Sequence, residues 1–587
     1  MKAFSLVVSI YFFLCHSLFL QSQNNKYFQK GFFWEENINN HGIRVIQKPN
    51  NGNFLIIGPT NDYSGIIEGF VFEMNEYGTM VQVLEFKEEG FNRVILRDLK
   101  ITEEGIALVG FVENEAEVKW YSYFLHIDED GNILHKKIGD DLPYNNAFFT
   151  MTPTPDGNYL VAGQIAERRG SLSYMDPFLM KIDKEGNELW QKQYYPYSKG
   201  NRFDEIIPNE DQTGYYLLGT VGYNVESGEP LIMEIDEDGN VIWEKIYDVF
   251  QEDSFSTIAT SIAVTNDNQL MFTALVNSVF AYGYIVKLDS SRNIEWRNDG
   301  DLFYSETIKE VNPLADGTYV AVGANSNYLI SGKTRTDADM QLAKLSAEGE
   351  VLWERRYGGL SSDYGFDMMV TEEGGFIVCG RLQSLELTDA DFGAALYVVK
   401  TNCMGLLTEP QTSFSAEQDP ENPLTYHFTN HSEYVYPDSI DGGHFLWDFG
   451  DGATSEELHP THSYANKGES RIVTLTAVVC SDTSRFDIKV VTGEEIVGIE
   501  GVDGLPAFSF KLYPNPTSSG QVFLDYDLPK EGLLQLYDLQ GKEVGNWRLD
   551  SQNKELILDL EKLRSGMYVY RLTSEGAFLK GGKLVVE

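Results

Sequence analysis

A phrase of two short strands around an Asp-Gly turn recurs along this chain and constrains its fold more than any other feature. In the clearest copy, Leu231–Tyr247, apolar and β-branched runs flank Asp238-Gly239. Gly239 supplies the positive φ that a tight hairpin needs. Self-similarity at a long, fixed period predicts stacked or radially arranged supersecondary units. Further copies cover Phe124–Ile138, Phe178–Tyr194 and Leu342–Tyr357, with a weaker copy at Tyr284–Arg297.

A second hairpin precedes each copy, and a glycine closes one of its strands in all but one repeat. Thr154–Gly163 is the clearest example, and Thr273-Ala274 fills the one gap. The spacing gives seven repeats of roughly 54 residues with four strand-like segments each. Four strands per repeat, without helical periodicity, predict an all-β fold in the form of a seven-bladed β-propeller. The closing glycines are Gly58, Gly110, Gly163, Gly219, Gly323 and Gly380.

The two ends of the repeat region predict that the N-terminus closes the ring of blades. The seventh copy runs through Leu396–Lys400, and no tryptophan strand follows it. A strand of that type, Gly31–Glu36 with Trp34, precedes the first repeat without a hairpin of its own. We expect it to complete the seventh blade, since an open array would leave an exposed sheet edge. The propeller is then expected to span residues 23–406.

The charge balance excludes several classes of partner. Asp and Glu outnumber Lys and Arg by 89 to 45, which gives a formal net charge of −44. So acidic a chain is a poor match for nucleic acid or anionic lipid, whose charge it shares. A soluble, exported surface accounts for the excess, and distributed cation binding is the sharper alternative.

Residues 1–22 have the layout of a secretory signal peptide, with Met1-Lys2 followed by an apolar run from Phe4 to Leu20. No later run of about 18 apolar residues follows, so we expect no membrane span. Three cysteines remain after cleavage, in a number and spacing that predict neither a disulfide scaffold nor a metal site. They are Cys379, Cys403 and Cys480, and pairing of the first two stays open.

A different block follows the repeats at residues 412–491. It carries Trp447-Asp-Phe-Gly-Asp-Gly452, then His459-Pro-Thr-His-Ser-Tyr464 and an alternating strand. This block resembles the PKD family, which implies an immunoglobulin-like β-sandwich of the kind found in surface and secreted proteins. Trp447 and Phe449 are expected to point inward with Phe445. We expect structural roles for His459 and His462, because no further metal ligands cluster near them.

The last block, residues 508–587, lies beyond a Gly- and Glu-rich linker at 492–507. Its motifs are Tyr513-Pro514-Asn515-Pro516, Gly541 after a Tyr-Asp strand, and Gly566 with Tyr568. In order and spacing these residues resemble the type A C-terminal sorting domain of type IX secretion cargo from Bacteroidetes. The resemblance implies a small β-sandwich that directs export through the periplasm and is commonly removed. It also implies the secretion machinery as a partner, and a secreted or outer-membrane surface location.

Strand order predicts where a binding site lies. In each blade both Asp-Gly turns lie on one face of the disc, the turn face, and the long connections emerge on the opposite, loop face. Loops on a rigid scaffold commonly carry binding residues, and aromatic rings beside polar groups suit a sugar or a protein partner. Packing of these side chains onto neighbouring blades is the competing interpretation. The candidates are Tyr174, Tyr197, Tyr364, Arg168, Arg169, Asp204 and Asp363.

The sequence offers no complete catalytic or metal motif. Asp128–Asn132 and Asp236–Asn240 resemble fragments of calcium loops, but both lack the downstream Glu and stand where a hairpin turn is required. The repeat resembles the docking motif of quinoprotein dehydrogenases, yet their adjacent cysteine pair is absent, and the serine of sialidase boxes is not kept. No G-x-S-x-G, HExxH or P-loop occurs. We therefore expect a non-catalytic protein that binds a glycan or protein, without metal or cofactor. An extracellular polysaccharide hydrolase is the alternative, and a quinone-dependent oxidoreductase a weaker third.

Overall fold

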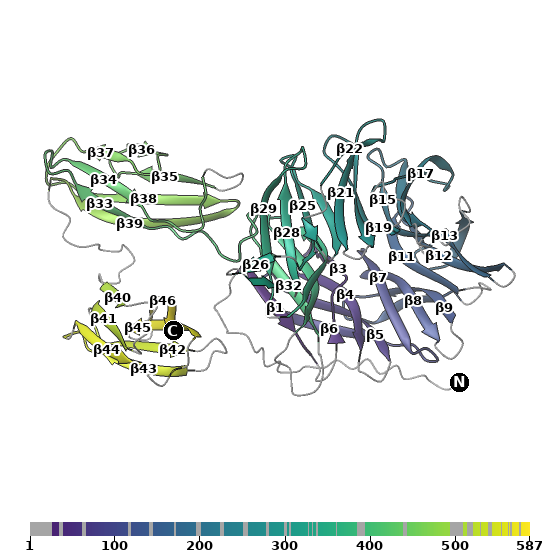
Figure 1. Ribbon diagram of the computed structural model, residues 1–587, viewed down its shortest axis with the longest axis horizontal. Helices are drawn as coiled ribbons and strands as arrows, with labels where there is room; N and C mark the ends of the chain where they lie inside the picture. Colours follow the sequence, from purple (N-terminus) through teal and green to yellow (C-terminus); the bar gives the residue numbers. More distant parts are fainter. Residues whose placement is uncertain are drawn as a thin grey trace. The chain divides into compact units, whose positions relative to one another are not determined.

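A computed structural model gives the architecture of the chain (Figure 1). The residues that it describes are 26–34, 39–61, 66–114, 119–139, 145–169, 172–194, 201–222, 228–249, 256–277, 281–298, 302–304, 307–326, 328–330, 333–335, 338–359, 361–383, 394–437, 443–493, 509–513, 521–528, 530–537, 543–552, 554–560, 563, 566–574 and 577–586.

Within these ranges the protein is all-β, and no helix is long and apolar enough to cross a membrane. The strands from β1 to β32 form one compact part, and those from β33 to β46 belong to another.

The N-terminal part consists of small antiparallel sheets with four main strands each, except that one parallel pair, Ile67 with Arg93, joins the first two into a single nine-stranded sheet. The first sheet contains β3 (Arg44–Gln47), β4 (Phe54–Asn61), β5 (Ile67–Met74) and β6 (Met80–Phe86), with β2 (Asn39–Asn40) paired to β4. The second contains β7 (Arg93–Ile101), β8 (Ile106–Asn114), β9 (Lys119–Ile127) and β10 (Ile133–Ile138). The third contains β11 (Asn145–Pro153), β12 (Tyr159–Arg169), β13 (Leu172–Ile182) and β14 (Glu188–Gln193). The fourth contains β15 (Asn201–Pro208), β16 (Gly214–Val221), β17 (Glu229–Asp236) and β18 (Val241–Ile246).

Three more sheets of the same kind follow. The fifth contains β19 (Ser256–Val264), β20 (Leu270–Asn277), β21 (Tyr282–Leu288) and β22 (Ile294–Arg297), with β23 (Phe303–Tyr304) paired to β21. The sixth contains β24 (Ile308–Pro313), β25 (Tyr319–Asn325), β28 (Asp339–Leu345) and β29 (Val351–Tyr357), and a separate hairpin joins β26 (Tyr328–Ile330) to β27 (Lys333–Arg335). The seventh contains β30 (Asp363–Val370), β31 (Phe376–Gln383), β32 (Ala394–Thr401) and β1 (Phe28–Phe32).

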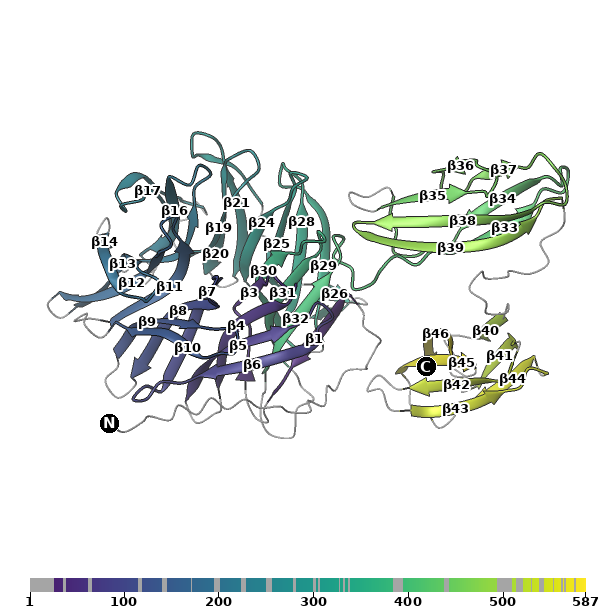
Figure 2. The same ribbon diagram turned by 180° about the vertical axis from the view of Figure 1, so that it is seen from behind.

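The seventh sheet takes its outer strand from the N-terminus. β1 pairs antiparallel with β32, with Gly31 opposite Tyr397, and the two strands lie side by side in both views (Figures 1 and 2). The strand thus begins three residues before the expected Gly31. Trp34 continues onto the first sheet, where its ring centre lies 5.0 Å from that of Phe70. The N-terminal segment therefore connects the last sheet to the first.

Apolar cores lie between consecutive sheets, and a further core lies between the last sheet and the first. One cluster joins the first and second sheets, for instance, and another joins the sixth and seventh. A further cluster places Phe28 and Cys379 of the seventh sheet against Phe54 and Phe70 of the first. Burial of such large side chains is the main favourable term for sheets of this size. Cys379 is a free, fully buried thiol, so the pairing with Cys403 that the sequence left open is not made.

The closing glycines of the repeat have a steric cause. The first strand of every sheet from the second to the seventh contains a β-bulge, for example between Leu96 and Asp98. A Cβ at Gly110 would lie 1.9 Å from the Ile95 carbonyl oxygen beside that bulge, and at Gly380 it would lie 1.8 Å from that of Tyr364. A Cβ this close to a carbonyl oxygen would clash, which explains why glycine recurs at these positions; only the fifth sheet has alanine there, at Ala274.

The Asp-Gly turns satisfy their own backbone. Asp236 Oδ1 accepts hydrogen bonds from the backbone N–H groups of Asp238 (3.0 Å) and Asn240 (2.7 Å), and Gly239 has φ +76°. Asp128 repeats the pattern with Asp130 and Asn132. These carboxylates therefore act as turn residues, each bound to its own loop.

The C-terminal part contains two pairs of sheets. In the first pair, Trp447 and Phe449 are buried together with Phe445, as the PKD-like motif predicts, and the Trp447 ring centre lies 4.9 Å from that of Phe414 on the facing sheet. His462 stacks on Phe449, and its Nε2 lies 2.8 Å from Asp451 Oδ2, which is a structural contact. One sheet contains β33 (Phe414–Gln418), β34 (Thr425–Asn430) and β37 (Thr461–Ser463), and the other β36 (Thr454–Ser455), β35 (His444–Asp448), β38 (Ser470–Val479) and β39 (Asp482–Val491).

The second pair of sheets encloses a leucine-rich core. Of the expected sorting motif, Tyr513 lies in a strand and Tyr568 is buried, whereas Pro514, Asn515, Pro516 and Gly541 fall outside the described residues. Gly566 begins the strand that carries Tyr568. One sheet contains β40 (Ser509–Tyr513), β41 (Gln521–Asp527) and β44 (Glu555–Asp559), and the other β43 (Glu543–Leu549), β42 (Gly532–Tyr537), β45 (Gly566–Ser574) and β46 (Ala577–Val586).

Candidate binding site

The first strands of the seven sheets place equivalent side chains around a common centre. In six of them the residue after the bulge takes this position, and Arg44 takes it in the first sheet. We call these residues the central ring. Its members are Arg44, Asp98, Thr150, Glu205, Ser261, Glu310 and Asp367.

Several ring side chains bond their sheet to the next one. Asp98 Oδ2 accepts a hydrogen bond from the Met151 N–H of the third sheet (2.8 Å). Glu205 Oε2 accepts one from Ile262 in the fifth (2.8 Å). Asp367 Oδ2 closes the series, because it accepts a hydrogen bond from the Val45 N–H of the first sheet (2.6 Å). The last sheet is therefore bonded to the first through the centre as well as through β1.

Arg44 lies among four ring carboxylates that come from four other sheets. Its Nη1 is 3.1 Å from Asp367 Oδ1, and its Nε is 3.5 Å from Asp98 Oδ1. Glu205 and Glu310 lie slightly farther away, at 3.7 and 3.9 Å. Burial alone would lower the pKa of Arg44, but the four carboxylates hold it well above its ordinary value. One guanidinium is thus shared among four acids of a water-poor centre.

The ring carboxylates do not titrate alike. Burial, followed by repulsion from Glu205 and Asp367, raises the pKa of Glu310 well above its ordinary value. Burial also raises the pKa values of Glu205 and Asp367. Burial opposes ionisation of Asp98 too, but Lys100 and Arg44 together lower its pKa. The ring therefore combines an Asp98 whose pKa is lowered with a Glu310 whose pKa is raised.

A cavity of about 250 Å³ adjoins the ring on the side toward the turn face. Ring residues form one wall, and Lys100, Thr152, Pro208 and Met368 continue it along the first strands. Pockets for drug-sized ligands generally start at about 300 Å³. This cavity is therefore suited to a small ligand or to ordered water.

A second set of side chains faces the centre on the loop side of the ring. These are the six bulge residues and Ile43, each of which stands one position before a ring residue, and all of them are at least partly accessible to solvent. We call them the bulge set. Its members are Ile43, Arg97, Phe149, Asp204, Thr260, Lys309 and Phe366.

Each of the two cations in the bulge set is followed in the next sheet by an aromatic ring. The Arg97 guanidinium lies 5.3 Å from the centre of the Phe149 ring, and Lys309 Nζ lies 5.8 Å from that of Phe366. Arg202, two residues before Asp204 on the same strand, lies 5.9 Å from the Phe149 ring. Cations at this distance from an aromatic face are attracted to it, but the ring does not neutralise them.

The positive charges exceed the acids that could pair with them. Arg202 Nε lies 2.8 Å from Asp204 Oδ1. For Arg97 and Lys309, no carboxylate lies within ion-pair distance among the described residues. In a chain with a net charge of −44, so local an excess of cations is unexpected. An anion placed between them would gain charge-assisted hydrogen bonds.

The pKa shifts reflect this crowding of cations. Burial, followed by Arg97 and Arg202, lowers the pKa of Lys309 to about 8. Burial among the surrounding strands, followed by the positive charge of Arg202, lowers the pKa of Arg97, although this side chain is exposed to solvent. Burial and the neighbouring Arg381 and Arg97 lower the pKa of His41 to about 4, so that this imidazole is neutral at pH 7. Each lowered pKa indicates that this region disfavours further positive charge.

The sequence-derived candidates fall in different places. Asp204 belongs to the bulge set, and the Tyr364 ring stacks on Phe366 at 6.2 Å. Asp363 is buried and accepts hydrogen bonds from the Gly359 (2.7 Å) and Gln383 (3.0 Å) N–H groups, so it holds loop ends together. Three further candidates lie in strands, but their side chains are not described: Arg168, Arg169 and Tyr174. Tyr197 falls outside the described residues.

Sequence reasoning missed Arg97, Lys309, Arg202 and the central ring. A signal was present: a polar residue interrupts each apolar first strand shortly before the closing glycine, as Asp98 does before Gly110. Its meaning depends on the bulge, which places that residue and its predecessor on the same inner side of the sheets.

Comparison with known proteins identifies one segment. Residues 511–587 match the family described as secretion system C-terminal sorting domain. No curated protein matches the chain. Among solved structures, a protein of unknown function from Bacteroides caccae is 17% identical over 49% of this chain and 90% of its own (TM-score 0.30). The PKD1 domain of the Vibrio cholerae metalloprotease PrtV is 31% identical over 14% of this chain and 96% of its own (TM-score 0.12). A puromycin hydrolase is 11% identical over 66% of this chain and 58% of its own (TM-score 0.39).

The matched segment fixes the route of the protein through the cell. A type IX sorting domain interacts with its secretion machinery and is carried at the C-terminus of cargo. The match covers most of the block that the sequence motifs assign to sorting. The protein is therefore an exported cargo that passes through the periplasm to the cell surface or the medium.

Proposed function

We propose that the seven sheets form a closed seven-bladed β-propeller that follows a signal peptide at residues 1–22. The pairing of β1 with β32 and the hydrogen bond from Val45 to Asp367 support closure, since both join the last sheet to the first. Residues 412–491 then form a PKD-like, immunoglobulin-like sandwich around Trp447. The host is a bacterium of the Bacteroidetes group, as the sorting motif implies.

We further propose that the propeller binds an acidic glycan on its loop face, without catalysis. The observation that carries this proposal is the pair of cations in the bulge set, Arg97 and Lys309, which have no carboxylate partner among the described residues. A carboxylate or sulfate group on a sugar matches them in charge and in hydrogen-bonding geometry. Phe149, Phe366 and Tyr364 add aromatic faces of the kind that sugar rings contact.

The test is calorimetric titration of the full chain with uronate and sulfated oligosaccharides. Hydrogen bonds to a charged group contribute roughly 1.5–3 kcal/mol, so Arg97→Ala and Lys309→Ala should each weaken binding by about 10- to 100-fold. Lys87→Ala is a charge-matched control, because Lys87 is exposed and bonded to Glu68 far from the bulge set. Equal losses in the control and the two variants would overturn the site.

The pH dependence provides a second readout for the same site. Because the pKa of Lys309 is lowered to about 8, this ammonium loses its proton within the accessible range. We expect affinity for an acidic ligand to fall as the pH rises from 7 to 9. The fall should disappear in Lys309→Ala, which has no such proton to lose.

A polysaccharide hydrolase remains the second candidate, and one observation favours it. The raised pKa of Glu310 and the lowered pKa of Asp98 are the kind of divergence that separates an acid from an ionised partner in glycosidases. The sharing of Arg44 by four carboxylates favours a structural role for the ring. Release of reducing ends by the wild type, lost in Glu310→Gln with an unchanged melting temperature, would establish the hydrolase.

The sorting domain gives a separate prediction about delivery. Because residues 508–587 form their own pair of sheets, their removal should leave the rest of the chain folded. The truncated protein should accumulate in the periplasm of its host and still bind the acidic ligand. Fractionation followed by immunoblotting provides the measurement. Normal surface delivery of the truncation would contradict the assignment of these residues to sorting.

A further inference from the structure

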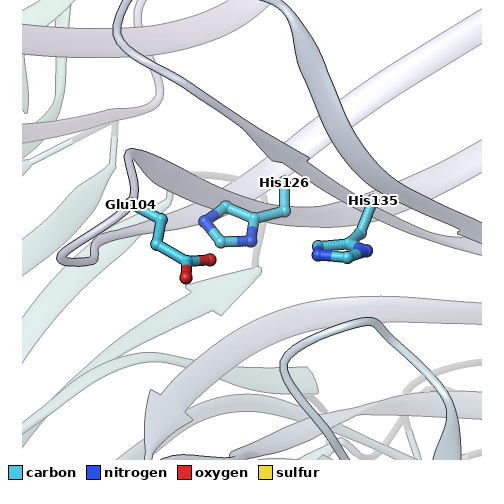
Figure 3. Close-up of side chains that lie close together, drawn as sticks. All are labelled: Glu104, His126 and His135. Carbon is cyan, nitrogen blue, oxygen red and sulfur yellow. The ribbon is translucent and has the colours of Figure 1, made fainter.

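Three side chains of metal-binding types converge at the second sheet. Glu104, His126 and His135 each offer one ligand atom, and these atoms all lie within 4.8 Å of one another. His126 lies between the Glu104 carboxylate and the His135 ring (Figure 3). Glu104 belongs to the turn between β7 and β8, and the histidines stand opposite each other on β9 and β10. The cluster is far from the bulge set along the strands, because it lies at the turn face.

The burial of His126 needs an explanation. Only 2% of its surface is exposed, and its Nδ1 has no hydrogen-bond partner in acceptable geometry. The Thr102 hydroxyl lies 3.0 Å from Nε2, and the Lys184 backbone also lies within reach of the ring. Neither contact occupies Nδ1 in good geometry, so this nitrogen is placed to bind a metal ion while its neighbours orient the ring.

Equivalent positions in three other sheets show one arrangement that the repeat builds there. In the third sheet Lys181 forms an ion pair with Asp156 of the turn (2.6 Å) and stands opposite Trp190. The fifth sheet repeats this with Lys287, Asp267 and Trp296, and the sixth with Lys344, Asp316 and Trp353. Asp156 and Glu104 occupy the same place in the turns Thr154-Pro-Asp-Gly157 and Thr102-Glu-Glu-Gly105.

The second sheet therefore departs from the repeat at all three positions at once. Lysine, aspartate and tryptophan have become His126, Glu104 and His135, and each replacement is a ligand type. The lost cation is the one that held the turn carboxylate. A bound dication supplies that positive charge again, since it bridges the same turn to the same two strands.

We propose that Glu104, His126 and His135 bind a divalent transition metal ion, with Zn²⁺ as the best match. Two imidazoles and one carboxylate are a common zinc ligand set, with a fourth position left for water. Tetrahedral zinc–ligand bonds of about 2.0–2.2 Å place the ligand atoms about 3.4 Å apart, so the three atoms must move closer together than the 4.8 Å within which they lie here. Glu104 is exposed and His135 only partly buried, so both can make this movement.

Neighbouring groups are compatible with a cation at this position. Lys184 Nζ lies 4.0 Å from Glu104, but both side chains are largely exposed and free to separate.

The experiment is titration of the metal-stripped full chain with Zn²⁺ by calorimetry, in millimolar Mg²⁺ to saturate nonspecific acidic sites. We expect one tight site per chain and a higher melting temperature with Zn²⁺. Glu104→Gln and His135→Ala, at accessible positions, should each weaken Zn²⁺ binding at least tenfold. A triple variant, Glu104→Asp, His126→Lys and His135→Trp, restores the repeat pattern, so it should fold and lose the site. A matched change in the third sheet, Asp156→Asn, should leave Zn²⁺ binding unchanged.

Cobalt substitution adds a spectroscopic readout. Co²⁺ in a tetrahedral site of nitrogen and oxygen ligands absorbs visible light more strongly than hydrated Co²⁺, and this signal should vanish in His135→Ala. Equal Zn²⁺ affinity in the wild type and all variants would show adventitious binding to an acidic surface and overturn the proposal. The absence of a tight site in the wild type would do the same.

Discussion

Replacing Arg44 by methionine should destabilise the N-terminal part by about 3–5 kcal/mol at pH 7, because it leaves the buried carboxylates without their positive partner. Asp367, Asp98, Glu205 and Glu310 all lie within 4 Å of this one guanidinium. Without it, four acids crowd a centre from which bulk water is largely excluded. Methionine preserves most of the side-chain volume, so the loss reports charge more than packing.

The sign of the pH dependence makes this prediction specific. Removal of Arg44 raises the pKa values of Glu205, Glu310 and Asp367 beyond their already raised values, so the folded variant binds protons more tightly than the unfolded chain. Its stability should therefore rise as the pH falls from 7 toward 5, and the difference from the wild type should shrink. Thr150→Val, at an uncharged ring position, should show no such recovery.

The buried Cys379 thiol provides the measurement. It lies in the core between the seventh and first sheets, so its reaction with a thiol reagent reports opening at the point of closure. Denaturant unfolding and labelling should both shift in Arg44→Met. An unchanged labelling rate and midpoint at pH 7 would mean that the ring contributes little to stability.

Deletion of residues 23–38 should have a comparably large effect, because it removes β1 from the seventh sheet. The strand supplies five paired positions along β32 and buries Tyr27 and Phe28 almost completely. Two such aromatic side chains contribute roughly 3–6 kcal/mol through burial, and the deletion also exposes the edge of β32. We expect faster Cys379 labelling, a lower melting temperature and concentration-dependent aggregation.

A shorter deletion is the matched control. Removal of residues 23–25 alone ends before Lys26, where the described chain begins, and leaves β1 intact. This protein should melt like the full chain. If the longer deletion also melts unchanged, β1 is dispensable and closure depends on the central ring and the apolar cores.

The repeat predicted the sheets well because its turns and glycines are local. Gly239 and its equivalents predicted the hairpins. The number of closing glycines predicted the number of sheets, although the steric reason for glycine at these positions was not visible in the sequence. That cause, the approach of a carbonyl oxygen to within about 2 Å of a Cβ position, exists only once the bulged strand is paired. The predicted N-terminal strand was placed three residues late, because Trp34, on which the prediction rested, lies beyond the end of β1 at Phe32.

The candidate site could be predicted only in part. Tyr364 and Asp204 were singled out as loop residues, and they lie beside Phe366 and Arg202 on first strands. Arg97 and Lys309 are isolated single charges in sequence, and only the bulges bring them to the same side of the sheets. Likewise, His135 visibly replaced a tryptophan, but its relation to Glu104 depends on the pairing of β9 with β10.

The central claim is that the cations of the bulge set receive an acidic sugar. The most direct measurement is titration of the wild-type protein with an oligogalacturonide and with its carboxyl-reduced counterpart, in which a neutral hydroxymethyl group replaces each carboxylate. We predict binding of the acidic oligosaccharide that weakens with added salt and is lost in an Arg97→Ala, Lys309→Ala double variant, and at least tenfold weaker binding of the neutral one. Equal affinity for the two sugars, or acidic binding that survives the double variant, would contradict the account.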